Sequence, residues 1–435
     1  MEQNIYEKLK KKSFRINDSV INFVLSLIVP FLASMVLYII FMFLATASGN
    51  SNAEFMKTPF VHVVSLIFTP LVFLFIYIIY CKKTRVNCFV ASDISFKLNW
   101  LKILTVVLIA GVSVVLIAPF ISLVDYSLTL IGYAPSNSLP LEMKNAGAFI
   151  LGTIAMAILP AICEELLFRG IILKGFQSKL NPHAAIFLTA IMFTLLHGSL
   201  QQTVYQFILG VLLGYAMFFG KSIIYPMILH FVNNFIIVVN SFIYQVNNVE
   251  LSSVVYRTGW DYVFPILLFI VAGLIVAGLV NILKDYKGIY NSGKKIVLVP
   301  TIIHFINAVS CAVVYLCCAP MVENPALTKN QITGLTYLPY ILLIVISLGL
   351  MLGVFVWFTK LKGKNTNQQV QVLEQNDLET SNKSESLEVE SNIIVSEVES
   401  TQNKLTKSEK IAILGSCAFA LLLWISNTIM QFFNL

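Results

Sequence analysis

Residues 147–173 read GAFILGTIAMAILPAICEELLFRGIIL, an apolar run longer than the roughly 20 residues that cross a bilayer. Its length predicts a membrane-spanning helix. The charged residues within it are Glu164, Glu165 and Arg169. Each ionisable side chain inside a span costs at least about 2.5–3.5 kcal/mol on insertion scales, so these residues are candidates for function.

The rest of the chain has the composition of a membrane protein. Of 435 residues, 57% are hydrophobic and 12% charged, and the mean hydropathy is +0.82. These values exclude a water-soluble globular enzyme. The net charge of +7 comes from basic residues beside apolar runs, which favours membrane topology over a nucleic-acid partner.

Apolar runs separated by polar clusters predict an all-α, polytopic transmembrane helical bundle with about eleven spans. The predicted spans are residues 20–44, 60–81, 100–124, 147–173, 183–199, 203–219, 223–245, 262–283, 296–318, 337–359 and 411–432.

Lys and Arg concentrate in alternate loops. The N-terminal tail, residues 82–99 and residues 284–295 carry four or five each, whereas the intervening loops carry at most one. The positive-inside rule then predicts a cytoplasmic N-terminus and, with an odd number of spans, an external C-terminus. We expect a multi-pass protein of a cell membrane, and the bias toward Lys, Asn and Ile favours a bacterial plasma membrane.

Helical spacing assigns different tasks to the two glutamates. Glu165 and Arg169 are four residues apart, so they share a helix face and can form an ion pair. Glu164 lies about 100° around the helix from Glu165 and is free to face a cavity. His230 and Asn234 are also four apart and present an imidazole and a carboxamide from one face.

These groups and His197 predict a water-activating site with hydrogen-bond donors for an oxyanion. Their depths agree only in part. At 1.5 Å per residue, Glu164 lies roughly 15 Å from Lys174 and His230 roughly 10 Å from Ile223, but His197 lies roughly 21 Å from His183. Helix tilt or a late start of the fifth span must absorb this difference.

Three motifs occur in order within about seventy residues: Glu164-Glu165-x-x-x-Arg169, Phe193-x-x-x-His197 and His230-x-x-x-Asn234. Together they resemble the CPBP family of intramembrane proteases, also called Abi. That family comprises the type II CAAX prenyl proteases and bacteriocin-processing or self-immunity proteins. The resemblance covers residues 100–245.

The resemblance implies a role for each matching residue. Glu164 and His197 would activate water, and His230 and Asn234 would stabilise the tetrahedral oxyanion.

The same resemblance implies that Glu165 and Arg169 hold the site together. Because the family is often labelled a metalloprotease, a zinc site formed by Glu164, His197 and His230 is an alternative. We favour chemistry without a metal or other cofactor, since an Asn is a poor zinc ligand.

The sequence therefore suggests five parts. They are an N-terminal tail with two transmembrane helices (1–99), a CPBP-like intramembrane protease core (100–245), three additional transmembrane helices (246–360), a disordered polar linker (361–410) and a C-terminal transmembrane helix (411–435).

The predicted function is an intramembrane endopeptidase that cuts a membrane-associated or lipidated peptide or protein. A non-catalytic membrane immunity or scaffold protein is the alternative, and a transporter is a third. No His is followed by Glu, and neither a Gly-x-Ser-Gly nor a Gly-x-Gly-Asp motif occurs, which disfavours other intramembrane proteases. The substrate and the oligomeric state stay open.

Gly210-x-x-x-Gly214 is typical of close helix packing, and we assign it no further role.

Overall fold

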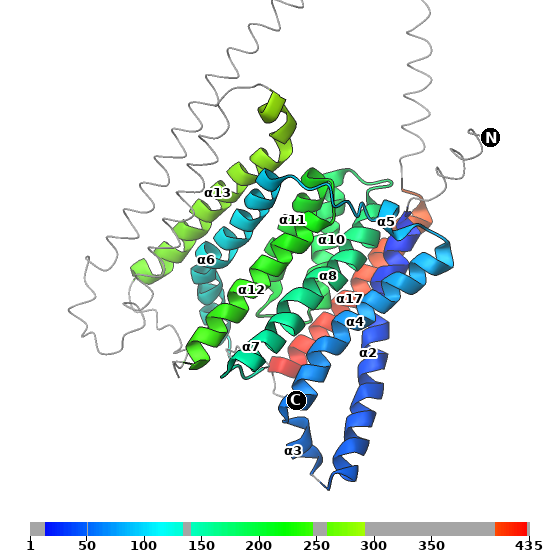
Figure 1. Cartoon of the computed structure of the whole chain (residues 1–435), viewed down its shortest axis with the longest axis vertical. Coiled ribbons are helices and arrows are strands. Elements are labelled where there is room, and N and C mark those ends of the chain that lie inside the picture. Colours follow the sequence, from blue (N-terminus) through cyan, green and yellow to red (C-terminus); the bar gives the residue numbers. More distant parts are fainter. Residues whose placement is uncertain (1–13, 50, 134–140, 247–258, 292–404, 433–435) are drawn as a thin grey trace, which may run out of the picture.

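The computed structural model describes residues 14–49, 51–133, 141–246, 259–291 and 405–432. Every regular element in these residues is a helix (Figure 1), and eight helices are long and apolar enough to cross a membrane. The prediction of an all-α polytopic bundle is confirmed, and the chain is a multi-pass membrane protein. The total number of spans and the side on which the N-terminus lies remain predictions.

The long helices are α2 (Ile16–Ala47), α4 (Pro59–Thr84), α6 (Trp100–Leu130), α11 (Thr203–Gly220), α12 (Ile224–Val246), α13 (Gly259–Asn291) and α17 (Lys407–Phe432). The remaining helices are α3 (Asn52–Met56), α5 (Cys88–Ala91), α10 (Pro182–Leu196) and the segments between Ala146 and Phe176.

Two differences from the predicted boundaries concern α10 and α17. The predicted span 183–199 is α10, whose 15 residues extend only about 22 Å, short of a bilayer core of about 30 Å. The polar linker was predicted to continue to residue 410, but α17 already begins at Lys407. The predicted spans 296–318 and 337–359, and residues 361–404 of the linker, lie outside the described residues.

The helix predicted from the opening apolar run is interrupted twice. It consists of α7 (Ala146–Thr153), the π-helix η1 (Ile154–Ile158), α8 (Leu159–Leu167), the π-helix η2 (Phe168–Ile172) and α9 (Leu173–Phe176).

Side chains from other helices bind carbonyl groups of the second π-helix. The Ser92 hydroxyl donates to the Gly170 carbonyl over 3.3 Å, and the Ser19 hydroxyl donates to the Ile172 carbonyl over 2.7 Å. A π-helix displaces carbonyls from the α-helical pattern, so such external donors stabilise it.

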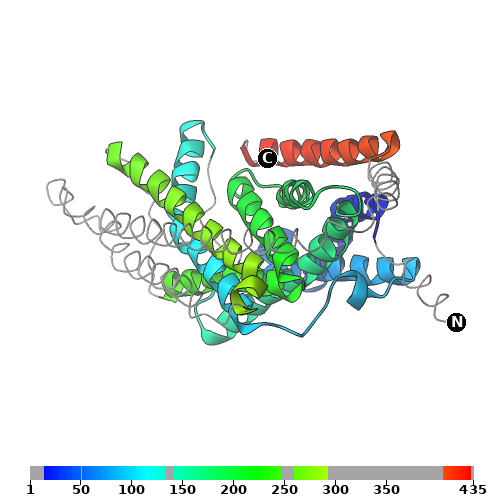
Figure 2. The same ribbon diagram turned by 90° about the horizontal axis from the view of Figure 1, so that it is seen from above.

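The described helices pack around two main hydrophobic clusters. One contains α2, α4, α8, α9 and α10, with buried residues such as Phe23, Phe168 and Phe193. The other contains α6, α11, α12 and α13, with α13 lying along α6 (Figure 1). The last helix, α17, packs against α2 and α10, as Figure 2 shows from above.

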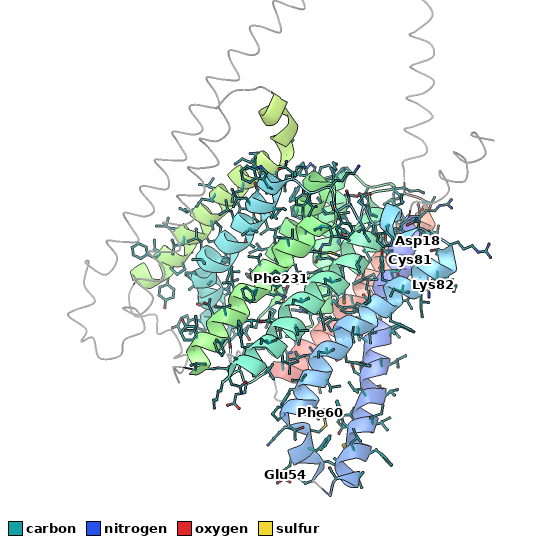
Figure 3. The ribbon with its side chains drawn as sticks, in the orientation of Figure 1. Asp18, Glu54, Phe60, Cys81, Lys82 and Phe231 are labelled. Carbon is teal, nitrogen blue, oxygen red and sulfur yellow. The ribbon has the colours of Figure 1, made fainter. Side chains whose placement is uncertain are left out.

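The basic loops meet at one end of the bundle. Asp93 binds Lys174 there, and the Ser222 hydroxyl donates to the Ser95 carbonyl over 2.8 Å. Figure 3 shows Lys82 at this end, and Glu54 at the far end of the α2–α4 hairpin. The loops around residues 82–99, 174–181 and 221 therefore lie together at this end.

The α10–α11 hairpin is closely packed through small residues. A Cβ atom at Gly210 would lie 3.1 Å from the Cα of Ala190, and one at Gly214 would lie 2.6 Å from Cγ2 of Ile186. The packing function predicted for these two glycines is therefore confirmed.

Local sequence fixes both ends of α10. At its start, the Asn181 side chain accepts a hydrogen bond from the Ala184 amide over 2.8 Å, and Pro182 occupies the first turn. At its end, His197 is the C-cap and Gly198 follows with φ +57°. This left-handed residue turns the chain back toward α11 and leaves His197 inside the bundle.

Candidate active site

Glu165 and Arg169 form a fully buried ion pair. Arg169 Nη1 donates to Glu165 Oε1 over 2.7 Å, and neither side chain is exposed. The four-residue spacing predicted this contact, and the structure contains it even though the pair lies at the junction of α8 and η2. An unpaired charge at such a position would be strongly destabilising.

His230 binds the same carboxylate oxygen. Its Nδ1 lies 2.9 Å from Glu165 Oε1, and the imidazole is 3% exposed. Since this oxygen already accepts a hydrogen bond from Arg169, we assign it as an acceptor here too, with Nδ1 of His230 as the donor. Sequence spacing indicated Arg169 as the partner of Glu165 but gave no sign of this second contact.

The Arg169 guanidinium links α11 and α10 to this group. Its Nη2 donates to the Gly210 carbonyl over 3.2 Å, and its central carbon lies 4.7 Å from the ring centroid of Phe193. Gly210 therefore does more than pack against α10, because its carbonyl accepts a hydrogen bond from a buried charge.

The Phe193 ring is the point at which all three motifs meet. Its centroid lies 4.7 Å from that of His197 and 6.1 Å from that of His230, both in edge-on geometry, and the ring also carries Arg169. Sequence analysis used Phe193 only as part of a motif and missed this contact role. The one sequence feature that could have indicated this role is the position of Phe193, four residues before His197.

His197 reaches this ring because α10 is short. The predicted conflict in depth is resolved by a helix that ends within the bundle rather than crossing it. The Nδ1 atom of His197 lies 2.8 Å from the Phe193 carbonyl, which can only accept, so Nδ1 carries the proton. In the neutral ring, Nε2 then has a lone pair available for a base or a ligand.

Glu164 has a buried oxygen that no described protein group binds. Its Oε2 is inaccessible and unpaired within the described part of the chain, as are Oε2 of Glu165 and Nε of Arg169. The Glu164 carboxylate is close enough to His230 to interact with it electrostatically. Buried polar atoms of this kind need a partner, and a water molecule or a substrate group can provide one.

Asn234 belongs to a separate chain of hydrogen bonds. Its Nδ2 donates to the Met156 carbonyl in η1 over 3.0 Å, and its Oδ1 accepts from Nδ2 of Asn233 over 3.0 Å. The Tyr205 hydroxyl in turn donates to Oδ1 of Asn233 over 2.5 Å. Nothing in the sequence singled out Asn233 or Tyr205, because no motif spacing involves them.

These contacts fix the orientation of the Asn234 amide. Its oxygen is held by Asn233, and one of its two N–H groups is used by Met156. The amide therefore has one further N–H group to offer.

The described residues contain no group of three His, Cys, Asp or Glu side chains arranged to hold a metal ion. His230 binds Glu165 through Nδ1, which leaves its Nε2 for another partner. The zinc set of Glu164, His197 and His230 stays an alternative prediction, and we derive no step through a metal.

A family model described as type II CAAX prenyl endopeptidase Rce1-like matches residues 146–236. The match covers about a fifth of the chain and contains all three motifs. Comparisons with curated proteins and with solved structures found no match. The family resemblance is confirmed, over a shorter stretch than the predicted 100–245.

Proposed function

We propose that the protein is an intramembrane endopeptidase, because residues 146–236 match the family model of the type II CAAX prenyl endopeptidases. Its substrate is a membrane-associated or lipidated peptide or protein, and the attacking nucleophile is a water molecule activated by Glu164 and His197. The observation that carries the proposal is the convergence of Arg169, His197 and His230 on the ring of Phe193.

The proposed base is formed by Glu164 and His197. The unpaired Oε2 of Glu164 can accept a hydrogen bond from water, and so can the free Nε2 of His197. Removal of a proton lets the water oxygen bond to the substrate carbonyl carbon. The carbonyl oxygen becomes an oxyanion, the C–N bond then breaks, and the proton passes to the departing amine.

The proposed oxyanion donors are His230 and Asn234. Nδ1 of His230 donates to the Glu165 carboxylate, so its Nε2 can donate to the oxyanion when the ring carries both protons. Asn234 offers its second N–H group. Preorganised donors of this kind contribute about 100- to 1000-fold to a rate.

Two substitutions test the proposal directly. Purified protein in lipid vesicles is given a fluorogenic farnesylated CAAX peptide or a fluorogenic hydrophobic leader peptide. Glu164→Gln and His197→Ala are each expected to reduce cleavage by at least about 100-fold, the usual contribution of a positioned base. Glu142→Gln is the matched control, because Glu142 is exposed and paired with Lys144.

Cleavage at the wild-type rate by either variant would contradict the assignment. The alternative of a non-catalytic immunity or scaffold protein predicts a different pattern. In that case wild-type protein cleaves neither peptide, and the two substitutions lower only the yield of folded protein.

We also propose that the reaction needs no metal. Cleavage by wild-type protein is then expected to persist after dialysis against 1,10-phenanthroline. Loss of activity that returns on adding Zn²⁺ would show that a metal is required.

A further inference from the structure

The C-terminal helix α17 presents a polar stripe to the bundle. Trp424, Asn427, Thr428 and Gln431 recur at helical spacing on one face of an otherwise apolar helix. The polar atoms of Trp424 and Thr428 are buried, whereas Leu422 is 66% exposed on another face. The rotation of α17 about its axis therefore turns Trp424, Thr428 and Gln431 toward protein, with Asn427 at the exposed edge of the stripe.

Two residues of this stripe bind a single backbone oxygen beside the candidate catalytic histidine. Nδ2 of Asn427 donates to the Gly198 carbonyl, and Nε2 of Gln431 donates to the same oxygen over 3.5 Å. Gln431 is itself oriented by the Tyr133 hydroxyl, which donates to its Oε1 over 3.2 Å. A carboxamide in a membrane-spanning helix has few other partners, so these bonds hold α17 to the turn.

The bound carbonyl belongs to the residue that directly follows His197. Gly198 has φ +57°, a conformation that glycine adopts without strain, and a Cβ atom there would lie 2.9 Å from Nδ2 of Asn427. The turn thus has the close approach and the backbone geometry that require glycine. Holding the Gly198 carbonyl fixes the end of α10 from which the His197 ring projects.

A second contact sets the height of α17 along the bundle. Oε2 of Glu409, near its start, lies 2.8 Å from Nζ of Lys179, which precedes α10. The helix is therefore held at both ends of α10, by an ion pair at one end and by the Gly198 carbonyl at the other.

We propose that Asn427 and Gln431 are positioning residues for His197. They restrain the His197–Gly198 turn so that the imidazole keeps its place against Phe193 with Nε2 toward the reacting water. This inference rests on the proposed function of His197. By this proposal α17 helps to position a catalytic residue, although it begins about 170 residues after the end of the matched family domain.

The test compares kcat and KM of full-length variants in lipid vesicles with the fluorogenic farnesylated peptide. Misplacing a catalytic group by about 1 Å can cost up to about 100-fold in rate. Asn427→Ala is expected to lower kcat by about 10- to 100-fold while KM changes by less than about twofold, because the substrate-binding surface is unaltered. Gln431→Ala, which loses the longer bond, is expected to lower kcat by about threefold.

Two further variants separate positioning from general stability. Asn427→Gln keeps an amide donor and is expected to recover at least about one third of wild-type kcat. Ser426→Ala, at the neighbouring exposed position, is the matched control and should match wild-type protein. If Asn427→Ala also melts at a lower temperature than wild-type protein, the kcat of Gln431→Ala and the recovery by Asn427→Gln decide the question.

The outcomes distinguish this inference from the proposed function. If Glu164→Gln cleaves as fast as wild-type protein, the proposed function is wrong, whatever Asn427 does. If Glu164→Gln is inactive but Asn427→Ala has wild-type kcat, only the positioning role is wrong. A kcat above wild-type in Asn427→Ala would also overturn it, since α17 would then restrain the reaction.

Discussion

Two hydrogen-bond networks lie along α12, one turn apart, and they differ in charge. The charged network joins Glu165, Arg169 and His230 with the Gly210 carbonyl. The amide network joins Tyr205, Asn233 and Asn234 with the Met156 carbonyl. Each network connects α12 to α11 and to the interrupted helix between Ala146 and Phe176.

The two networks differ in what their loss would cost, and neither of them uses the oxygen proposed for catalysis. The ionic side chains of the charged network are at most 3% exposed. Removing one of them therefore leaves a buried charge without a partner and without solvent. The amide network is neutral, and losing one of its members costs about one ordinary hydrogen bond. Neither network uses Oε2 of Glu164, which leaves this oxygen for chemistry.

The largest effect is expected when the charged network loses its cation. Arg169→Met leaves the Glu165 carboxylate buried without its cation, which should lower the free energy of unfolding by about 3–5 kcal/mol. The measurement is denaturant unfolding of the purified protein in detergent micelles.

The double variant Glu165→Gln/Arg169→Met removes both charges and serves as the control. It should be less destabilised than Arg169→Met alone. Equal destabilisation of the single and double variants would show that packing, not charge, dominates this site.

A medium effect is expected where α11, which contributes to both networks, packs on α10. Gly214→Ala places a Cβ atom 2.6 Å from Cγ2 of Ile186 and should lower stability by about 1–3 kcal/mol. Gly111→Ala is the matched control, because a Cβ atom there would meet nothing within 4 Å. Similar unfolding curves for the two variants would argue against tight packing of the hairpin.

A smaller effect is expected in the amide network. Tyr205→Phe removes one hydroxyl and its hydrogen bond to Asn233, and should cost about 0.5–1.5 kcal/mol. Tyr38→Phe changes a tyrosine that is 50% exposed and should change stability by less than about 0.5 kcal/mol. If Tyr205→Phe were as damaging as Arg169→Met, the proposed contrast between the networks would be lost.

The smallest effect is expected for an ion pair that is not fully buried. Glu409→Gln removes the charge that pairs with Lys179, whose side chain is 26% exposed. Partly solvated pairs contribute about 0–1 kcal/mol and weaken as salt is added. Unfolding at low and high salt measures this, and a salt-independent loss above about 2 kcal/mol would contradict it.

Contacts within one helix could be predicted from the sequence, and contacts between helices largely could not. The Glu165–Arg169 pair follows from helical spacing alone. The contact of His230 with Glu165 depends on how α12 is rotated against α8, and no local pattern encodes that rotation.

The end of α10 shows a similar limit. Hydropathy located the apolar run but extended the predicted span to residue 199, whereas α10 ends at Leu196. A single glycine with a left-handed backbone, Gly198, hardly changes the mean hydropathy of the surrounding residues. The bond from Asn427 to Gly198 joins residues 229 positions apart, and its one sequence sign is the polar stripe of an apolar helix.

The two π-helices on either side of α8 have a consequence for insertions and deletions. Each accommodates one residue more than an α-helix of the same rise, and the Met156 carbonyl of the first is bound by Asn234. Deleting one residue between Ile154 and Ile158 would convert that stretch to ordinary α-helix and rotate everything before it by about 100° relative to the glutamates. The number of residues in this stretch, rather than any one side chain, therefore determines how the helix before it is rotated relative to Glu164 and Glu165.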